Sequence, residues 1–275
     1  MRILLVSDIH SNIVALDAVL AHASRGHGYS AMWVLGDIVG YGPAPNECVE
    51  RLASVGAEAI SGNHDLACSG VVGLETLSGP ASTAAAWTRR QLTPGNVEKL
   101  ASLPATRAVG EFTLVHGSPR DPAREYLLTA EQAAASMSAL ATRHCLMGHS
   151  HRQLLFRFNS SGTEVPSGFA VDAAIEIGQD RVFINPGSVG QSRDGDWRTA
   201  YALLDTERFT VSFHRCEYDR ARVAEQMRSA GLPGVLINRM MTGRRRTGSE
   251  RMRRVLTGQT AWSRFVRLAA KVRHR

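Results

Sequence analysis

Short, mostly apolar runs alternate with amphipathic stretches through the first half of the chain. Each run spans four or five residues and is followed by Gly, Asp or His, which is typical of a buried strand that ends in a loop. The stretches between the runs repeat apolar residues every three or four positions, as at Ile13, Leu16 and Leu20, which predicts helices with one buried face. We expect strands at residues 3–7, 31–35, 58–61, 112–115 and 144–147, and helices at 12–23, 45–55, 82–92 and 130–140.

The second half has apolar runs with no long helical stretch between them. This pattern predicts a second, largely antiparallel sheet with strands at residues 154–158, 169–177, 182–185, 201–205 and 209–216. Two sheets packed face to face with helices outside give the α/β class and a four-layer α/β/β/α sandwich of two mixed sheets with flanking helices. Residues 70–80 and 117–124 are rich in Gly, Ser, Pro and Asp and predict loops.

Composition indicates a globular protein and argues against a membrane span. Hydrophobic residues make up 44% of the 275 positions, and no apolar run is long enough to cross a bilayer. The first apolar run, residues 3–6, is too short for a signal-peptide core and leads directly into Asp8. Cys48, Cys68, Cys145 and Cys216 form no CxxC pair, which favours reduced thiols in a cytoplasmic protein.

The basic charge of the chain is concentrated in its last 32 residues. Residues 244–275 contain eleven Lys or Arg and one Glu, a net charge of +10, which leaves −3 of the overall +7 for residues 1–243. We therefore divide the chain into a domain at 1–243 and a basic tail at 244–275. From Trp262 onward the tail has the spacing of an amphipathic helix. Such a helix could bind an anionic membrane or nucleic acid, or pack on its own domain or a partner; a disordered basic end is equally compatible.

Five polar blocks follow the predicted strands of the first half. Loops at the carboxyl ends of strands gather along one edge of an α/β sheet, so these blocks can meet at one site. Carboxylate and imidazole ligands suit Mn, Fe, Co, Ni or Zn, and one carboxylate can bridge two cations. The blocks are Asp8-x-His10, Gly36-Asp37, Gly62-Asn63-His64-Asp65, His116-Gly117 and Gly148-His149-x-His151.

In this order the five blocks resemble the calcineurin-like metallophosphoesterase superfamily, in particular its small bacterial and archaeal phosphodiesterase-like branch. The resemblance extends over about residues 1–243 and includes the strings at 36–43, 115–119 and 185–191. It implies the metallophosphoesterase fold and a role for each block residue. By that resemblance Asp8, His10 and His151 hold one metal, Asn63, His116 and His149 hold the second, Asp37 bridges them, His64 lies near the scissile phosphate, and Asp65 hydrogen-bonds His64.

The resemblance implies a dinuclear metal-dependent phosphoesterase with a phosphate-ester substrate, most simply a phosphodiesterase. Paired cations would activate a hydroxide to attack phosphorus, and His64 would assist the leaving group. Three questions stay open: whether the metals are Mn, Fe, Ni, Co or Zn, what the oligomeric state is, and whether the tail brings the protein to a membrane. A phosphomonoesterase, a protein phosphatase or a nucleotide pyrophosphohydrolase is the alternative within this class. Outside it, the chain could be an idle adaptor that binds membrane or nucleic acid through its tail.

Weaker signals surround these blocks. The turn at 185–191 could present backbone N–H groups to an anion or could be purely structural. Tyr41 could line the pocket or pack in the core. Four arginines could contact substrate phosphate or lie on the surface as ordinary charges: Arg120, Arg124, Arg193 and Arg198.

Overall fold

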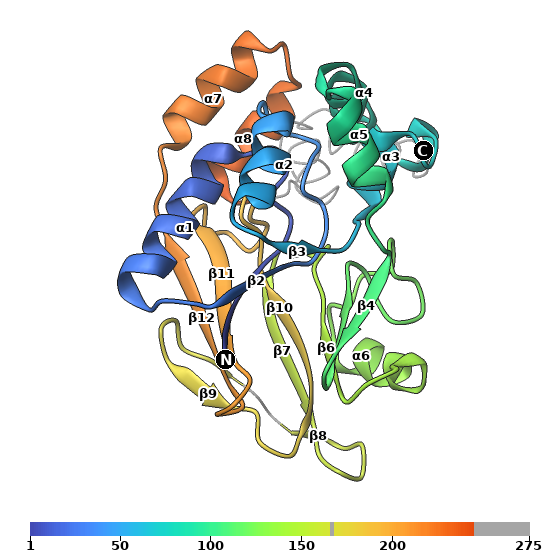
Figure 1. Ribbon diagram of the computed structural model, residues 1–275, viewed down its shortest axis with the longest axis vertical. Helices are drawn as coiled ribbons and strands as arrows, with labels where there is room; N and C mark the ends of the chain where they lie inside the picture. Colours follow the sequence, from blue (N-terminus) through green and yellow to red (C-terminus); the bar gives the residue numbers. More distant parts are fainter. Residues whose placement is uncertain (166–167, 245–275) are drawn as a thin grey trace, which may run out of the picture.

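Two six-stranded sheets form the centre of the computed structural model, which describes residues 1–165 and 168–244 (Figure 1). The first sheet has the order β3-β2-β1-β11-β12-β9 and the second β4-β5-β6-β10-β7-β8. The strands of the first are β1 (Arg2–Val6), β2 (Ala31–Val34), β3 (Glu58–Ala59), β9 (Ala174–Glu176), β11 (Thr199–Asp205) and β12 (Thr210–Cys216). Those of the second are β4 (Thr106–Val109), β5 (Phe112–Val115), β6 (His144–Leu146), β7 (Gln153–Phe158), β8 (Glu164–Val165) and β10 (Arg181–Pro186).

Both sheets are mixed, as predicted, but the second half of the chain does not form a sheet of its own. Strands β1, β2 and β3 are mutually parallel, and β11 pairs antiparallel with the other edge of β1. In the second sheet β10 pairs parallel with β6 and antiparallel with β7. The prediction of a separate sheet was wrong because β1 and β6 are buried and each needs a partner on both edges to satisfy its backbone. Strands from the second half of the chain supply those partners.

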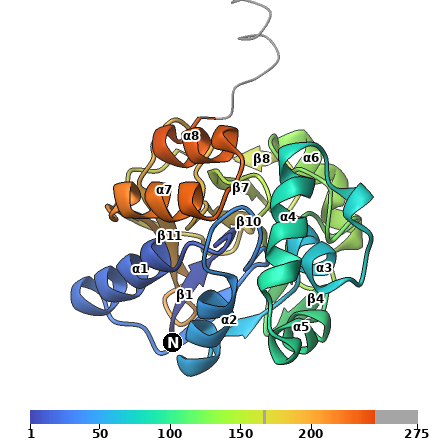
Figure 2. The ribbon, with the colours of Figure 1, turned by 90° about the horizontal axis from the view of Figure 1, so that it is seen from above.

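Side-chain alternation along the strands separates the four layers. On β1, Ile3 and Leu5 face the core between the sheets, whereas Leu4 and Val6 face the helices. Phe183 on β10 packs with the smaller cluster under α6. Figure 2 shows α1, α7 and α8 on one side of the molecule and α3, α4, α5 and α6 on the other. The helices are α1 (Ile13–Gly26), α2 (Pro45–Ser54), α3 (Asn63–Ser69), α4 (Pro80–Gln91), α5 (Pro94–Ala101), α6 (Ala130–Ser136), α7 (Arg220–Ser229) and α8 (Gly234–Thr242), with 3-10 turns at Leu74–Thr76 and Met137–Ala139.

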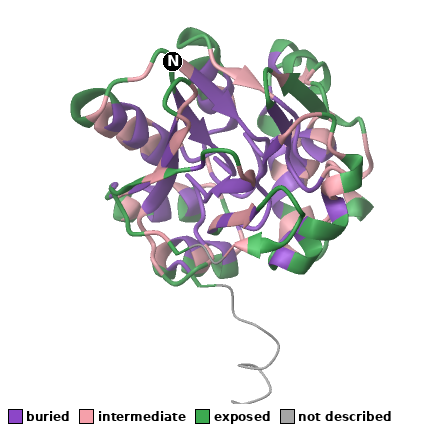
Figure 3. Ribbon diagram, turned by 90° about the horizontal axis from the view of Figure 1, so that it is seen from below, coloured by how far each residue is buried: buried purple, intermediate pink, exposed green. Residues whose placement is uncertain are grey.

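The predicted strands and helices of the first half all occur, with ends shifted by up to four residues. The strand predicted at residues 169–177 is too long, since this segment contains only the short β9. Helices α3, α5, α7 and α8 were not predicted. Helix α3 begins inside the third polar block, where Asn63 and His64 were assigned to a loop. Figure 3 shows buried residues gathered on the strands and on the inner faces of the helices.

Other expectations concern compartment and the tail. All four cysteines are free and buried, as expected of structural thiols. Over residues 1–165 and 168–244, none of the helices combines the length and apolarity that a bilayer crossing needs. The amphipathic helix expected from Trp262 lies outside the described residues.

His144 on β6 is a buried histidine away from the polar blocks. Its ring packs 5.0 Å from that of Phe112, and its Nδ1 accepts a hydrogen bond from the Val182 backbone N–H at 3.4 Å. Burial lowers the pKa of His144 to about 4. The neutral form is therefore the one that fits the fold, because protonated Nδ1 could not accept this bond.

We expect His144 to make the protein less stable in mild acid. Its pKa is about 4 when folded and about 6.5 when unfolded. Between these values the unfolded chain binds more protons, so the free energy of unfolding falls as pH falls from 6.5 toward 4. Urea unfolding at pH 7 and pH 5 should show the wild type losing about 1–2 kcal/mol more than His144→Gln. Equal losses in the two proteins would show that His144 does not titrate in this way.

Candidate metal centre

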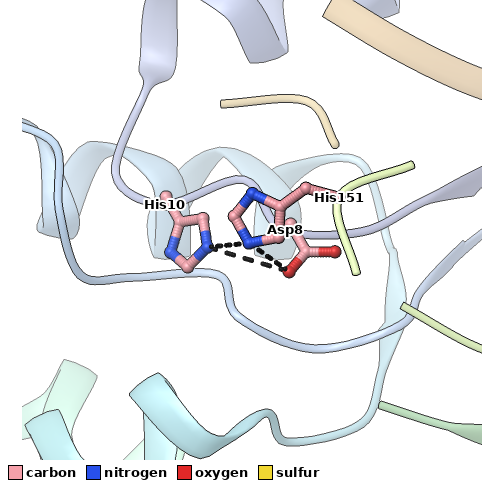
Figure 4. A group of neighbouring side chains, drawn as sticks. All are labelled: Asp8, His10 and His151. Atoms are coloured by element: carbon pink, nitrogen blue, oxygen red, sulfur yellow. Dashed lines mark hydrogen bonds and ion pairs between the residues drawn. The ribbon is translucent and has the colours of Figure 1, made fainter. Parts of the chain in front are cut away.

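The five polar blocks converge at one edge of the two sheets. Asp37 lies between the others, because its Oδ2 is 3.6 Å from His10 Nε2 and 3.3 Å from His116 Nε2. On one side, Asp8 Oδ1 lies 3.1 Å from His151 Nε2 and 3.7 Å from His10 Nε2 (Figure 4). The two halves of the constellation therefore meet at a single carboxylate oxygen.

Two groups of potential ligand atoms meet at Asp37: one includes Asp37 and the other lies next to it. Each group has its atoms within 4.8 Å of one another, and every member is buried. A third group joins His64 to His10 and Asp37. The first two groups are Asp8, His10 and His151, and Asp37, His116 and His149.

Four histidines direct a bare ring nitrogen toward the centre. His116 donates from Nδ1 to the Leu35 carbonyl at 2.8 Å, and His10 donates from Nδ1 to the Val39 carbonyl at 3.2 Å. A carbonyl can only accept, so in the neutral ring each bond fixes the tautomer and leaves the other nitrogen as a lone pair.

The remaining two histidines are held in the same way. His151 Nδ1 bonds the Gln191 carbonyl, and His149 Nε2 bonds the Arg124 carbonyl at 3.1 Å. The inward nitrogens then lie in pairs, with His10 Nε2 3.1 Å from His151 Nε2 and His116 Nε2 3.1 Å from His149 Nδ1. In neutral rings two lone pairs at this distance repel unless a proton or a metal cation lies between or beside them.

The buried negative charge of Asp8 and Asp37 also requires a positive charge nearby. Asp8 and Asp37 are at most 1% exposed, and within residues 1–165 and 168–244 no Lys or Arg forms an ion pair with either. Burial raises the pKa of each, but neighbouring imidazoles outweigh it and lower both pKa values. Burial also lowers the pKa of His116, but the Asp37 charge dominates and raises it to about 9. Two ionised carboxylates in this site require compensating positive charge, of which a protonated His116 supplies only one.

The third block does not hold the hydrogen bond that the sequence analysis predicted. Asp65 accepts from the Val39 N–H at 3.0 Å and from the Gly62 N–H at 2.9 Å. Nδ1 of His64 is buried and has no hydrogen-bond partner in the part of the chain that the structure describes. The prediction that Asp65 bonds His64 was wrong because both lie in the first turn of α3, where adjacent side chains point in different directions. Asp65 is instead the N3 residue of a capping box that ties the 39–40 loop to the start of α3.

His64 and Asn63 nevertheless lie at the centre. The His64 backbone N–H donates to Asp37 Oδ1 at 2.8 Å, and the His64 ring packs 4.9 Å from that of His10. Burial lowers the pKa of His64 to about 4. Asn63 lines the same cavity as Asp37, and its Oδ1 is buried without a partner among the described residues. An orphaned amide oxygen beside these imidazoles is a suitable metal ligand.

The loops that carry the candidate ligands are unusually strained. Of the nine described non-glycine residues with positive φ, seven lie here, and five of those are candidate ligands. Each such conformation costs roughly 1 kcal/mol or more. Strain of this kind gathers at sites where side-chain direction matters more than stability. The five ligands are Asp8, His10, Asp37, His149 and His151.

The turn at 185–191 supports the centre structurally. Gly190 N–H donates to the Asp8 carbonyl at 2.9 Å, and Ser188 Oγ donates to the same carbonyl at 2.9 Å. Asn185 Nδ2 donates to the Gly148 carbonyl. These donors already have acceptors within the protein, so the structure favours the structural interpretation of this turn over the anion-binding one.

A cavity of about 420 Å³ opens beside Asp37, Asn63 and His64. Tyr41 lines it, as do Arg124 and Arg193 among the four arginines weighed from sequence. The other two are engaged in ion pairs, Arg120 with Glu125 and Arg198 with Asp196.

Sequence analysis missed two further residues of this cavity, Tyr126 and Arg239. Tyr126 stacks on His149 with ring centroids 4.0 Å apart. Arg239 lies on α8, far along the chain from every polar block. Neither residue belongs to a motif, so nothing in its local sequence pattern marks it.

The donor set fits divalent cations. Asp8, His10 and His151 form one group, His116 and His149 form another with Asp37, and Asn63 lines the same cavity as Asp37. Fixed tautomers, paired lone pairs, an orphaned amide oxygen and unbalanced carboxylates all point to the same kind of occupant. All seven ligands predicted from the sequence are thus brought to one place.

Comparison with known proteins gives a consistent result. The sequence model of the calcineurin-like phosphoesterase superfamily domain matches residues 1–208. An uncharacterised protein from Methanocaldococcus jannaschii is 32% identical over 249 residues, which cover 88% of this chain and 98% of that protein. The crystal structure of a metallophosphoesterase from Sphaerobacter thermophilus is 41% identical, with a TM-score of 0.78 over 88% of this chain and 99% of that one. A hypothetical protein from Pyrococcus horikoshii shares the fold at 20% identity, with a TM-score of 0.73 over 89% and 99% of the two chains.

Gly62 is the position where the smallest side chain should damage the centre. A Cβ there would lie 2.2 Å from Asp37 Oδ1 and 2.4 Å from the Asp37 amide nitrogen. We expect Gly62→Ala to displace Asp37 and weaken Mn²⁺ binding about 10- to 100-fold, measured by titration calorimetry. Gly95→Ala is the control, because a Cβ at Gly95 meets nothing within 4 Å. Wild-type affinity in Gly62→Ala would show that Asp37 is not held as described.

Proposed function

Because the chain belongs to the calcineurin-like phosphoesterase superfamily, we propose that it is a dinuclear metal-dependent phosphodiesterase. The observation that carries the dinuclear part is the position of Asp37 Oδ2, within 3.6 Å of a ring nitrogen on each side. Only a carboxylate placed between two imidazole groups can serve both at once. Family membership supports the general activity, hydrolysis of a phosphoester.

Each proposed ligand has a defined position. Asp8, His10 and His151 would hold one cation, Asn63, His116 and His149 the other, and Asp37 both. When bound, two divalent cations lower the pKa of a coordinated water and neutralise charge on the phosphate. Mn, Fe, Co, Ni and Zn all suit this mixture of imidazole, carboxylate and amide ligands.

The protein's own groups orient the ester and its leaving group. His64 is held by its backbone bond to Asp37 and by ring contact with Tyr41, whose centroid is 4.4 Å away. Its Nδ1 is buried and has no hydrogen-bond partner among the described residues. We assign His64 the task of passing a proton to the leaving oxygen, in the protonated form that the negative charge of a bound phosphate would favour, and Asp65 the task of positioning the turn that carries it. Proton delivery matters most for poor leaving groups such as sugar hydroxyls, which favours an alkyl phosphodiester as substrate.

Two alternatives are less well supported. Phosphomonoesterase and pyrophosphohydrolase activities would use the same ligands, so an assay must separate them from diester hydrolysis. An idle adaptor would not need a complete ligand set. Here all seven proposed ligands lie near Asp37, each imidazole among them has its outer nitrogen bonded to a carbonyl, and the backbone is strained at five of the seven.

We also propose cytoplasmic residence and contact of residues 244–275 with anionic surfaces. The four free, buried cysteines support the first proposal. The net charge of +10 in the tail supports the second. Each Lys or Arg near an anionic bilayer contributes about 1 kcal/mol of attraction, so the tail carries enough charge to localise the protein.

Substitution of the shared carboxylate should abolish hydrolysis. We expect Asp37→Ala to lower kcat on bis(4-nitrophenyl) phosphate with Mn²⁺ by at least about 1,000-fold, since both cations lose a ligand. Asp17→Ala, which removes only an exposed ion pair with Arg51, should be unaffected. In the wild type, kcat/KM for this diester should exceed that for 4-nitrophenyl phosphate. A more active monoester would overturn the diester assignment, and an active Asp37→Ala would overturn the metal mechanism.

Removal of residues 244–275 should show that the tail binds membranes but does not contribute to catalysis. We expect the shortened protein to hydrolyse bis(4-nitrophenyl) phosphate at the wild-type rate but to lose sedimentation with vesicles that contain phosphatidylserine. In the full chain, binding to these vesicles should weaken as ionic strength rises, because salt screens electrostatic attraction. Unchanged sedimentation after truncation would exclude the tail as a membrane contact, and binding of the full chain to RNA or DNA instead would assign it to nucleic acid.

A further inference from the structure

A second cavity lies against the first sheet, apart from the metal centre. It has a volume of about 220 Å³, and among the described residues it shares no lining side chain with the cavity beside Asp37. On β12, Val211 and Phe213 face the core between the sheets. Because side chains alternate along a strand, Ser212 and His214 face the opposite side, and both line this cavity.

Two short hydrogen bonds join a serine, a histidine and a carboxylate in this cavity. His214 Nδ1 lies 2.6 Å from Asp172 Oδ1, and His214 Nε2 lies 2.7 Å from Ser212 Oγ. Burial lowers the pKa of His214, although the bond to Asp172 opposes this effect, so the ring is neutral at neutral pH. An ionised carboxylate can only accept, so Nδ1 carries the proton and Nε2 accepts from the Ser212 hydroxyl. These are the geometry and the roles by which a hydrolytic triad is recognised.

The imidazole is held in place, whereas the serine can meet a ligand. Tyr201 stacks on His214 with ring centroids 5.0 Å apart and planes 20° from parallel, and Gln153 Nε2 donates to the His214 carbonyl at 3.1 Å. The side chain of His214 is 1% exposed, whereas that of Asp172 is 64% exposed. Ser212 is partly exposed and lines the cavity. The hydroxyl therefore faces the cavity with a fixed base bonded to it.

Asp172 is directed to this histidine by its backbone. Its φ of 66° makes it one of the two described non-glycine residues with positive φ outside the metal-ligand loops. The Asp172 N–H donates to the Phe213 carbonyl at 2.8 Å, which ties the loop before β9 to the residue next to His214. A left-handed backbone is uncommon for a residue with a side chain, and here it accompanies the placement of a carboxylate on an imidazole.

Positive side chains line the same cavity. Arg2 and Arg208 belong to its lining, together with a second carboxylate, Asp205, whose Oδ1 accepts from the backbone N–H groups of Glu207 and Arg208. Ser212 lies within the sheet, paired with β11 on one edge and β9 on the other, so its backbone groups are used in strand pairing. An oxyanion formed at this serine would therefore be stabilised by guanidinium groups and not by backbone amides.

We propose that Ser212, His214 and Asp172 form a second, metal-independent hydrolytic site that cleaves carboxylic esters. The Ser212 hydroxyl attacks the ester carbonyl, forms an Oγ–C bond and passes its proton to His214 Nε2. The bond between the carbonyl carbon and the leaving oxygen then breaks, and that oxygen takes the proton and departs as an alcohol. Water attacks the acyl group and gives a proton to Nε2. The Oγ–C bond breaks, Ser212 regains the proton, and the carboxylic acid leaves.

The size and lining of the cavity indicate the class of ester. Its 220 Å³ is below the range of about 300–1,000 Å³ that ligand pockets usually have. Most of its lining side chains are charged or polar, so a long acyl chain would bury little apolar surface there. A short acyl ester such as an acetate fits both observations. This activity goes beyond the proposed phosphoesterase function and uses none of its residues.

A fluorophosphonate probe tests the nucleophile on the Mn²⁺-loaded full chain. Reaction with an activated serine forms an Oγ–P bond, breaks the P–F bond and releases fluoride, while the serine proton passes to His214. Peptide mass spectrometry should find the probe on Ser212, a result that does not depend on any variant folding. We expect Ser212→Ala to abolish this labelling and Asp172→Ala, at an exposed position, to slow it at least about 10-fold. Ser229→Ala, which removes an exposed serine of α7, should be labelled at the wild-type rate.

Hydrolysis of 4-nitrophenyl acetate gives the second readout. We expect Ser212→Ala to lower kcat/KM for this ester at least about 100-fold, with thermal melts by circular dichroism showing that the variant is folded. If the acetate is hydrolysed through Ser212 but bis(4-nitrophenyl) phosphate is not hydrolysed, the phosphoesterase proposal fails while the serine site stands. Labelling at another residue, labelling that is equally fast in Asp172→Ala, or acetate hydrolysis that persists in folded Ser212→Ala would overturn the site. Labelling of Ser212 without turnover of the acetate would overturn the hydrolytic activity.

Discussion

Mutual repulsion among buried ligand atoms is the constraint on which this structure depends. Four imidazole rings and two ionised carboxylates face one another in a space from which water is largely excluded. Each outer ring nitrogen is bonded to a carbonyl, so the inner nitrogens cannot relieve the repulsion by exchanging tautomers. The arrangement is stable only with positive charge inside it, which makes metal binding and folding of these loops parts of the same equilibrium.

The sandwich supplies the rigidity that holds these atoms in place. Strands β1 and β6 are buried and paired on both edges, and the loops that follow them carry Asp8 and His149. Strain at the ligand positions is offset by the packed layers on either side of the sheets. Close contacts at Gly62, where no Cβ fits, allow the loop of α3 to approach Asp37. The support of the centre therefore extends from the ligands to the backbone around them.

Much of this could be predicted because the ligands occur in short blocks directly after apolar runs. The rule that strand ends share one edge was enough to bring seven distant residues together. What failed depended on contacts between remote segments. The pairing of β11 with β1 is decided by which edge of a buried strand is open, and no local pattern in residues 199–205 records that. The direction of Asp65 is set by the turn of α3, a short helix hidden inside a polar motif. Arg239 joins the cavity only because α8 folds back over it, so its role becomes visible only in three dimensions.

The most direct test of the account is the anomalous diffraction of crystals grown with Mn²⁺. Two manganese peaks per chain are predicted, one contacted by Asp8, His10 and His151 and the other by Asn63, His116 and His149, with Asp37 touching both. A single peak, or two peaks of which either lies out of reach of Asp37, would contradict the dinuclear centre from which the proposed function follows.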